Sequence, residues 1–321
     1  GGHIYENQTG DAACDQYHRY KEDVQIMKEM GMKAYRFSLS WARIMPEGTG
    51  TVNEKGLKYY DNLINELLDN GIEPFVTLYH WDLPYALHLQ GGWMNPNSPS
   101  WFYEYAKVVA EHFSDRVKNF FTINEPQCIV GLGYQTGEHA PGLKVGPSDY
   151  FRIWHNVLKA HGRAVEALRE FSKQPVKISM APCGALYVPE TNKPEDIEAA
   201  RKANFSLPEN SIGACSWDVA LCCDPVYLGQ YPEDILKEFG QFFPKVTDAD
   251  MKLISQPLDF YGQNIYNAVT VRAGEDGKAV RAARYDGFPQ TAIGWPVTPE
   301  VLYWAPKFMQ ERYKKPFMIT E

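Results

Sequence analysis

The sequence lacks the patterns that indicate a disulfide framework, a zinc site or a membrane span. None of its six cysteines forms a Cys-x-x-Cys pair, and Cys222 and Cys223 are adjacent, which suits neither type of site. It also has no long apolar run and no signal-peptide pattern. We therefore expect reduced thiols, no metal or other cofactor, and a cytoplasmic protein. A secreted protein stays open as an alternative, because the N-terminus looks incomplete.

Basic residues are also outnumbered by acidic ones, 32 to 40. The formal net charge is −8, and the charged residues are spread along the chain rather than gathered in runs. Nucleic acids and anionic membranes favour basic faces, so we expect neither as a partner. No Gly-x-Gly-x-x-Gly follows an expected strand, which leaves a dinucleotide-binding fold unsupported. Aromatic residues make up 14% of the chain, and by composition alone we attribute them to packing rather than to sugar stacking.

The chain does contain a regular alternation of amphipathic helices and apolar strands. Helical stripes separate the strands, which is typical of parallel strands covered by helices. The expected strands lie at 32–39, 72–79, 115–124, 176–181, 258–264 and 316–320. The long stretch 187–244 shows no strong strand and is interpreted as a helical excursion. We predict one α/β domain spanning residues 1–321.

Polar side chains stand at the ends of successive expected strands. They are Arg36, His80, Asn124 with Glu125, Asn264 and Glu321. A closed (β/α)₈ barrel builds its site from such residues, because the C-terminal ends of its strands meet on one face. This pattern favours a barrel over a doubly wound sheet.

Two of these residues, Glu125 and Glu321, are carboxylic acids that suit the cleavage of a glycosidic bond. One carboxyl group must protonate the leaving oxygen, and a second, ionised one must attack or stabilise the anomeric carbon. The amide of Asn124 can bind a sugar 2-hydroxyl beside Glu125. If the strand ends converge, the positive charge of Arg36 can keep Glu321 ionised.

Five segments of the chain, in order, resemble one known family. They are 35–44, 78–84, 122–126, 264–266 and 319–321. Each is moderately specific, but five in the same order make chance an unlikely source. The chain resembles the β-glucosidases of glycoside hydrolase family 1, which are retaining enzymes on a (β/α)₈ barrel. This resemblance implies a hydrolase without a metal or organic cofactor.

The resemblance also implies roles for single residues in catalysis. Glu125 would be the acid/base and Glu321 the nucleophile. Tyr266 and Arg36 would hold and polarise Glu321. Because the position of Glu125 holds glutamate rather than glutamine, hydrolysis of O-glycosides is favoured over that of thioglycosides.

The same resemblance implies a sugar subsite. Asn124 would bind the 2-hydroxyl group, and His80 and Trp81 would line the same subsite. Asn264 belongs to the segment that ends in the tyrosine, and it is a further candidate for substrate binding. The expected partner is a small β-glycoside or an oligosaccharide.

The chain departs from the family in length. Six of the eight barrel strands are recognised, and the first and eighth are missing. We therefore expect a piece of a longer barrel, or one that is completed by another chain, because unpaired strand edges are unstable. The sequence leaves open a homo-oligomer, the glycon, and two other functions: a 6-phospho-β-glycosidase, or an inactive carbohydrate-binding or structural barrel.

Overall fold

The computed structural model describes residues 4–207 and 209–321, and the chain divides into two compact units. The first comprises Gly1–Thr122 and Ala164–Lys177, and the second comprises Ile123–Arg163 and Ile178–Glu321. Strand β3 (Asn119–Asn124) begins in the first unit and ends in the second. The expectation of one domain over residues 1–321 stays a prediction.

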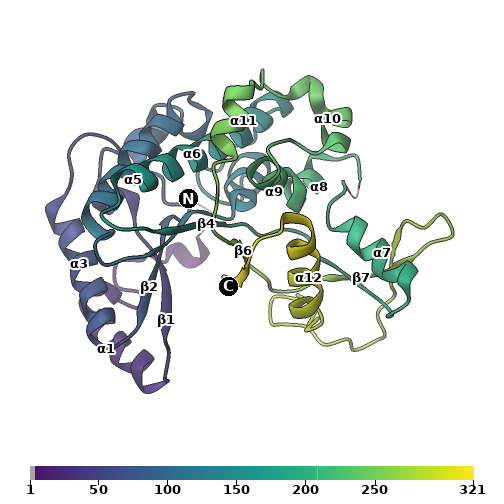
Figure 1. Cartoon of the computed structure of the whole chain (residues 1–321), viewed down its shortest axis with the longest axis horizontal. Helices are drawn as coiled ribbons and strands as arrows, with labels where there is room; N and C mark the ends of the chain where they lie inside the picture. The colour runs from purple at the N-terminus through teal and green to yellow at the C-terminus, as the bar shows by residue number, and fades with distance from the viewer. Residues whose placement is uncertain (1–3, 208) are drawn as a thin grey trace. The chain divides into compact units, whose positions relative to one another are not determined.

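The first unit is built from parallel strands and helices. Strands β1 (Ala34–Ser38) and β2 (Glu73–Tyr79) run side by side, with Ala34 paired to Glu73 (Figure 1). The first part of β3 continues this sheet next to β2. Its helices and helical turns are η1 (Tyr5–Asn7), α1 (Gln16–Glu29), α2 (Trp41–Ile44), α3 (Glu54–Asp69), α4 (Tyr85–Leu89), η2 (Gly92–Met94) and α5 (Ser98–Phe113).

Helix α3 shows how local sequence sets these elements. Asn53 caps its N-terminus by accepting a hydrogen bond from the Lys55 N–H at 3.2 Å. One face of the helix is buried, as its apolar spacing predicts, and Gly71 follows the helix with φ of +72°. Helix α5 begins at Ser98, Asn97 precedes it, and Pro99 lies in its first turn.

Aromatic side chains form much of the core of the first unit. The indole of Trp41 stacks on the Tyr105 ring at 5.1 Å between centroids. The Trp93 Nε1–H donates to the Tyr79 hydroxyl at 3.2 Å, and the Tyr105 hydroxyl donates to the Leu78 carbonyl at 2.9 Å. Each polar edge therefore has a partner while the rings stay buried. At these positions the aromatic content serves packing.

The second unit contains the remaining expected strands. Strand β6 (Tyr261–Gln263) pairs in parallel with β9 (Phe317–Ile319), with Tyr261 opposite Phe317. Strand β4 (Lys177–Ala181) is joined to the β6 segment through Ser179, whose hydroxyl donates to the Phe260 carbonyl at 3.0 Å and accepts from the Gly262 N–H at 3.1 Å. All six strands expected from the sequence are thus confirmed, with shorter bounds.

Helices make up most of the rest of this unit. They are α6 (Pro147–Phe171, which ends in the first unit), α7 (Pro194–Ala203), α8 (Ile212–Ser216), α9 (Val219–Tyr227), α10 (Glu233–Phe239), η4 (Gly240–Phe242), α11 (Asp248–Ile254) and α12 (Val301–Tyr313). The segment η3 (Cys128–Gln135) is π-helical. The helical excursion predicted for 187–244 is largely confirmed.

A small sheet was not predicted. Strands β5 (Tyr187–Pro189), β7 (Val269–Ala273) and β8 (Ala279–Arg281) form a three-stranded sheet in that order. Strand β5 lies inside 187–244, so the expectation of no strand there was wrong at this point. Three residues are too few to show an alternating pattern, and β8 is exposed throughout.

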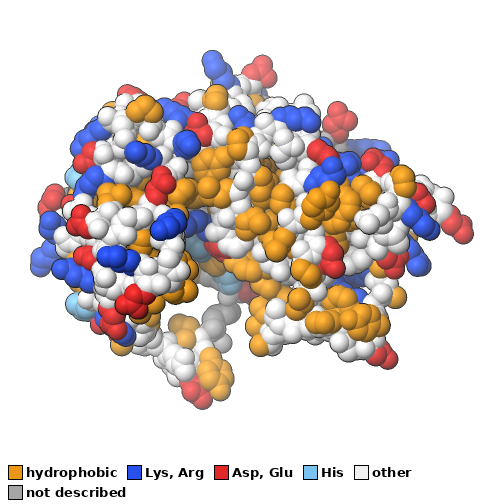
Figure 2. All heavy atoms as spheres, turned by 60° about the horizontal axis from the view of Figure 1, so that its bottom comes forward, with side chains coloured by type: hydrophobic (Ala, Val, Ile, Leu, Met, Phe, Trp, Pro, Cys, Tyr) orange, Lys and Arg blue, Asp and Glu red, His pale blue; other side chains and the backbone are white. Residues whose placement is uncertain are grey.

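The surface mixes charge and apolar area. Figure 2 shows hydrophobic side chains reaching one face of the molecule in groups between positive and negative ones. The part-exposed ion pairs include Arg116 with Asp61 at 2.7 Å. Across the ranges that the structure describes, no helix is long and apolar enough to cross a membrane.

Candidate active site

Glu125 lies directly after β3, in a backbone conformation that needs support. Its φ is +42°, in the left-handed region that costs a non-glycine residue about 1–3 kcal/mol. The Glu125 N–H donates to the Ala181 carbonyl at 2.8 Å, and the Glu125 carbonyl accepts from the N–H groups of Cys128 and Ile129. The side chain is only 6% exposed. The surrounding strands and helix therefore hold a buried carboxyl group in a fixed place.

Asn264 brings two other predicted residues together. Its Nδ2 donates to Glu125 Oε1 at 2.8 Å and to Asn124 Oδ1 at 3.1 Å. Its backbone N–H donates to the Pro182 carbonyl at 2.9 Å, and the residue is buried. Asn264 was predicted to bind substrate, which stays a prediction; the structure shows its amide group in contact with the predicted acid Glu125. Asn264 follows β6 directly, and its N–H bond to Pro182 places it beside the end of β4.

Glu321 contacts the residues that follow Asn264. Its side-chain Oε2 accepts a hydrogen bond from the Tyr266 hydroxyl, and its backbone carbonyl accepts from the Ile265 N–H at 3.0 Å. The Thr320 hydroxyl donates to Asn264 Oδ1 at 2.5 Å. The parallel pairing of β6 with β9 sets these contacts. The segment 264–266 therefore contacts both glutamates, one through Asn264 and the other through Tyr266.

Three predicted residues belong to the first unit. The Arg36 Nε–H donates to the Thr77 hydroxyl at 3.0 Å, and its guanidinium lies 5.1 Å from the centre of the Phe121 ring. The rings of His80 and Trp81 are 4.9 Å apart. Trp81 has φ of +82°, so it shares with Glu125 the strained backbone that clusters at functional sites. Contacts of these residues with a sugar or with Glu321 stay predictions.

Asp82 was not among the predicted residues, although it follows Trp81 directly. Burial raises the pKa of its carboxyl group to about 6, against hydrogen bonds from the Ser40 hydroxyl and from the N–H groups of Asp82 and His80. One carboxylate oxygen, Oδ1, is buried without a hydrogen-bond partner. The Asp82 carboxylate accepts from both ends of the turn that holds Trp81. Its proximity to a predicted sugar-binding pair was the signal that could have identified it.

Two buried cysteines beside Glu125 were also missed. The Cys128 thiol donates to Glu125 Oε2 at 3.2 Å, and Cys183 Sγ lies 3.9 Å from Gln127 Oε1. The Glu125 carboxylate oxygen and the two sulfurs all lie within 4.8 Å of one another. A hydrogen bond with Cys128, together with burial, raises the pKa of the Cys183 thiol. Sequence spacing gave no signal, because the two cysteines follow different strands.

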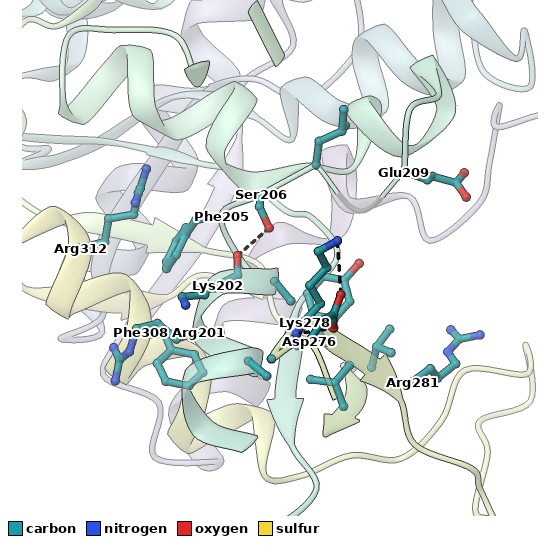
Figure 3. A pocket seen from close by; sticks show the side chains of 18 of the residues that line it. Arg201, Lys202, Phe205, Ser206, Glu209, Asp276, Lys278, Arg281, Phe308 and Arg312 are labelled. Atoms are coloured by element: carbon teal, nitrogen blue, oxygen red, sulfur yellow. Dashed lines mark hydrogen bonds and ion pairs between the residues drawn. The ribbon is translucent and has the colours of Figure 1, made fainter. Parts of the chain in front are cut away.

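A large cavity in the second unit is lined by none of these residues. It has a volume of about 1090 Å³ and is lined by residues of α7, β7, β8 and α12 (Figure 3). Most of its cations already have acidic partners, among them Arg312 with Asp224 at 2.5 Å and Lys278 with Asp276 at 3.4 Å. None of the predicted site residues lines it, so we assign the chemistry to the strand ends and not to this cavity.

Sequence comparison finds similar proteins over the whole chain. A family model described as glycosyl hydrolase family 1 matches residues 1–321. Beta-glucosidase A of Thermotoga maritima is 43% identical over 323 residues, covering 100% of this chain and 69% of its own length. Beta-glucosidase A of Acetivibrio thermocellus is 42% identical, covering 99% of this chain and 69% of its own length.

A solved structure shares the fold. The β-glucosidase of Thermotoga maritima in complex with glucoimidazole superposes with a TM-score of 0.85 at 42% identity, covering 99% of this chain and 70% of that one. This likeness confirms the fold class predicted from the sequence, a (β/α)₈ barrel.

Proposed function

The chain belongs to glycosyl hydrolase family 1, and from this membership we propose that it hydrolyses terminal β-linked glucose, or a related sugar, by a retaining double displacement. The observation that carries the proposal is the contact of one short segment, 264–266, with both Glu125 and Glu321. Two carboxyl groups at strand ends that both contact one segment suit this reaction.

In the first step, Glu125 gives its proton to the glycosidic oxygen as the aglycone leaves. Glu321 attacks the anomeric carbon and forms a covalent glycosyl-enzyme. The hydrogen bond from Tyr266 orients the Glu321 carboxylate and favours its charged form. The donation from Asn264 holds Glu125 Oε1, so the acid approaches the leaving oxygen in one orientation.

In the second step, Glu125 acts as the base. It takes a proton from water, the water oxygen attacks the anomeric carbon, and Glu321 departs as a carboxylate. Two inversions at the same carbon restore the β configuration. No step needs a metal or an organic cofactor.

We assign the sugar subsite to the residues that the sequence predicted for it. We assign the Asn124 amide group, whose Oδ1 accepts from Asn264, to the sugar 2-hydroxyl group. We assign His80 and Trp81 to contacts with the same sugar, and Arg36 to the charge that polarises Glu321. Glucose is proposed as the glycon because the relatives described above are named β-glucosidases.

The two other functions considered from the sequence are less favoured. Neither relative described above is named as acting on a phosphorylated sugar, and both are named as enzymes. We propose that the protein acts in the cytoplasm, which the cysteine spacing supports. We also propose a role in carbohydrate metabolism.

The experiment compares the wild-type protein with Glu125→Gln on a chromogenic β-glucoside. Loss of the general acid should lower kcat about 10²–10⁴-fold. The matched control is Glu138→Gln, which alters an exposed glutamate in the loop after η3 and should retain the wild-type rate. A wild-type protein that binds glucose but hydrolyses no β-glucoside would instead support a carbohydrate-binding function.

A further inference from the structure

The sulfur atoms of Cys128 and Cys183 face the carboxylate of Glu125 in the interior of the second unit. We propose that these three side chains form a site for a thiophilic divalent cation, and that an ion bound there inhibits hydrolysis by occupying the acid/base. The inhibitory part of this inference rests on the proposed function. The binding part rests on the side chains alone.

The spacing of the three ligand atoms suits one ion. In a tetrahedral zinc site, bond lengths of about 2.3 Å to sulfur and about 2.1 Å to oxygen place a sulfur and an oxygen about 3.6 Å apart and two sulfurs about 3.8 Å apart. Cys128 Sγ and Glu125 Oε2 are 3.2 Å apart. With all three atoms within 4.8 Å, the sulfurs need to approach by no more than about 1 Å.

The surroundings hold the ligands in place. The Gln127 Nε2–H donates to the Cys183 carbonyl at 2.7 Å, and Gln127 Oε1 accepts from the Cys183 N–H at 3.3 Å. This pair of bonds fixes the loop after β4 against the segment after β3. Cys128, Cys183 and Glu125 are all buried, so little water competes for the ion.

The donor set selects the class of cation. Two thiolates and a carboxylate favour soft or borderline ions such as Zn²⁺ and Cd²⁺ over Mg²⁺ and Ca²⁺, which prefer oxygen ligands. On binding, each thiol releases one proton to solvent, and the metal forms one bond to each sulfur. The three ligands carry a charge of −3 against +2 on the ion, which makes ejection of the cation unfavourable.

Inhibition follows from the ligand that the site shares with catalysis. When Glu125 Oε2 is bonded to an ion, that oxygen neither carries a proton to the leaving group nor removes one from water. Asn264 holds the other oxygen, Oε1. Both steps of the reaction then lose their proton carrier until a chelator removes the metal.

The test uses Cd²⁺ as the probe on the whole protein. Two quantities are measured together: the rate on a chromogenic β-glucoside relative to the metal-free rate of the same variant, and the near-ultraviolet absorption of cadmium–thiolate bonds with its stoichiometry. The variants are Cys128→Ser, Cys183→Ser and Glu125→Gln. The matched controls are Cys14→Ser, an exposed thiol, and Cys215→Ser, a buried thiol elsewhere in the unit.

We expect one Cd²⁺ per chain, inhibition reversed by chelator, and no effect of Mg²⁺. Cys128→Ser or Cys183→Ser should raise the concentration for half-saturation by more than about tenfold, the equivalent of about 1.4 kcal/mol. Glu125→Gln should also raise the Cd²⁺ concentration for half-saturation in the absorption titration. The controls should titrate as the wild type does.

Three results would overturn the proposal: no Cd²⁺ bound, inhibition that disappears with Cys14→Ser, or binding at the two cysteines that leaves the rate unchanged. A wild type with no glucosidase activity before metal is added would refute the proposed function. The absorption titration would still decide the binding site in that case. Far-ultraviolet circular dichroism confirms that each variant is folded before it is scored.

Discussion

Replacing Asn264 removes a hydrogen bond from Glu125 and leaves the bond from Tyr266 to Glu321 in place, so it tests the support of Glu125 by itself. The Asn264 side chain makes three hydrogen bonds: to Glu125 Oε1 at 2.8 Å, to Asn124 Oδ1 at 3.1 Å, and from the Thr320 hydroxyl at 2.5 Å. Asn264→Ala removes all three. The backbone N–H bond to Pro182 stays, so the strand end itself is preserved.

The expected loss can be worked from these bonds. A hydrogen bond to a charged group contributes about 1.5–3 kcal/mol and a neutral one about 0.5–1.5 kcal/mol, so one of the first kind and two of the second give about 2.5–6 kcal/mol. Because Asn264 is buried, water replaces little of this. The free energy of unfolding should fall by that amount. A misplaced acid/base should also lower kcat about 10²-fold with a smaller change in KM.

Asn264→Asp provides a sharper comparison, because it keeps the size of the side chain and the acceptor for Thr320. It replaces the donor with a carboxylate beside Glu125 and so disfavours ionisation of the pair. The alkaline limb of the pH profile of kcat/KM should then move to higher pH. Asn192→Ala, at an exposed asparagine, is the control and should match the wild type.

Urea unfolding, kcat, KM and the pH profile are the measurements. The reasoning is refuted if Asn264→Ala unfolds within about 0.5 kcal/mol of the wild type, the range of ordinary surface substitutions, with kcat unchanged. An unshifted alkaline limb in Asn264→Asp would show that residue 264 has no electrostatic contact with the acid.

Two further predictions concern Tyr266 and Asp82. Tyr266→Phe removes the hydrogen bond to Glu321 and should lower kcat about tenfold, a loss of about 1.4 kcal/mol, while stability changes little because the residue is 53% exposed. An unchanged kcat in steady-state assays would contradict it. The folded-state pKa of Asp82, about 6 against an ordinary 3.8, means that its contribution to stability is full below pH 4 and is lost as the pH rises through 6. Urea unfolding at pH 4 and pH 7 should show the wild type losing about 2–3 kcal/mol relative to Asp82→Asn, and a difference that is equal at the two pH values would rule this out.

The fold could be predicted where burial leaves a clear pattern. Strands β2, β3, β4 and β6 are mostly or wholly buried, and a parallel strand covered on both faces needs an apolar run that the sequence shows. The sheet of β5, β7 and β8 gave no such signal. Its strands are short, and β8 is exposed, so neither length nor periodicity marks it.

The site was predictable to the extent that strand ends determine it. The rule that chemistry gathers at the C-terminal ends of strands selected Asn124, Glu125, Asn264 and Glu321, and the structure brings them to one segment. It does not select Cys128 or Cys183. Their proximity depends on a left-handed residue and a π-helical turn after β3, and neither conformation follows from local composition.

The central claim is a covalent glycosyl-enzyme on Glu321 with Glu125 as its proton carrier. A 2-deoxy-2-fluoro-β-glucoside with a good leaving group tests it, because fluorine slows both steps while the leaving group speeds the first, so the intermediate accumulates. Mass mapping of the peptides from the trapped protein should find one fluoroglucosyl group on Glu321. A label on any other residue, or an active enzyme that never becomes labelled, would contradict the account.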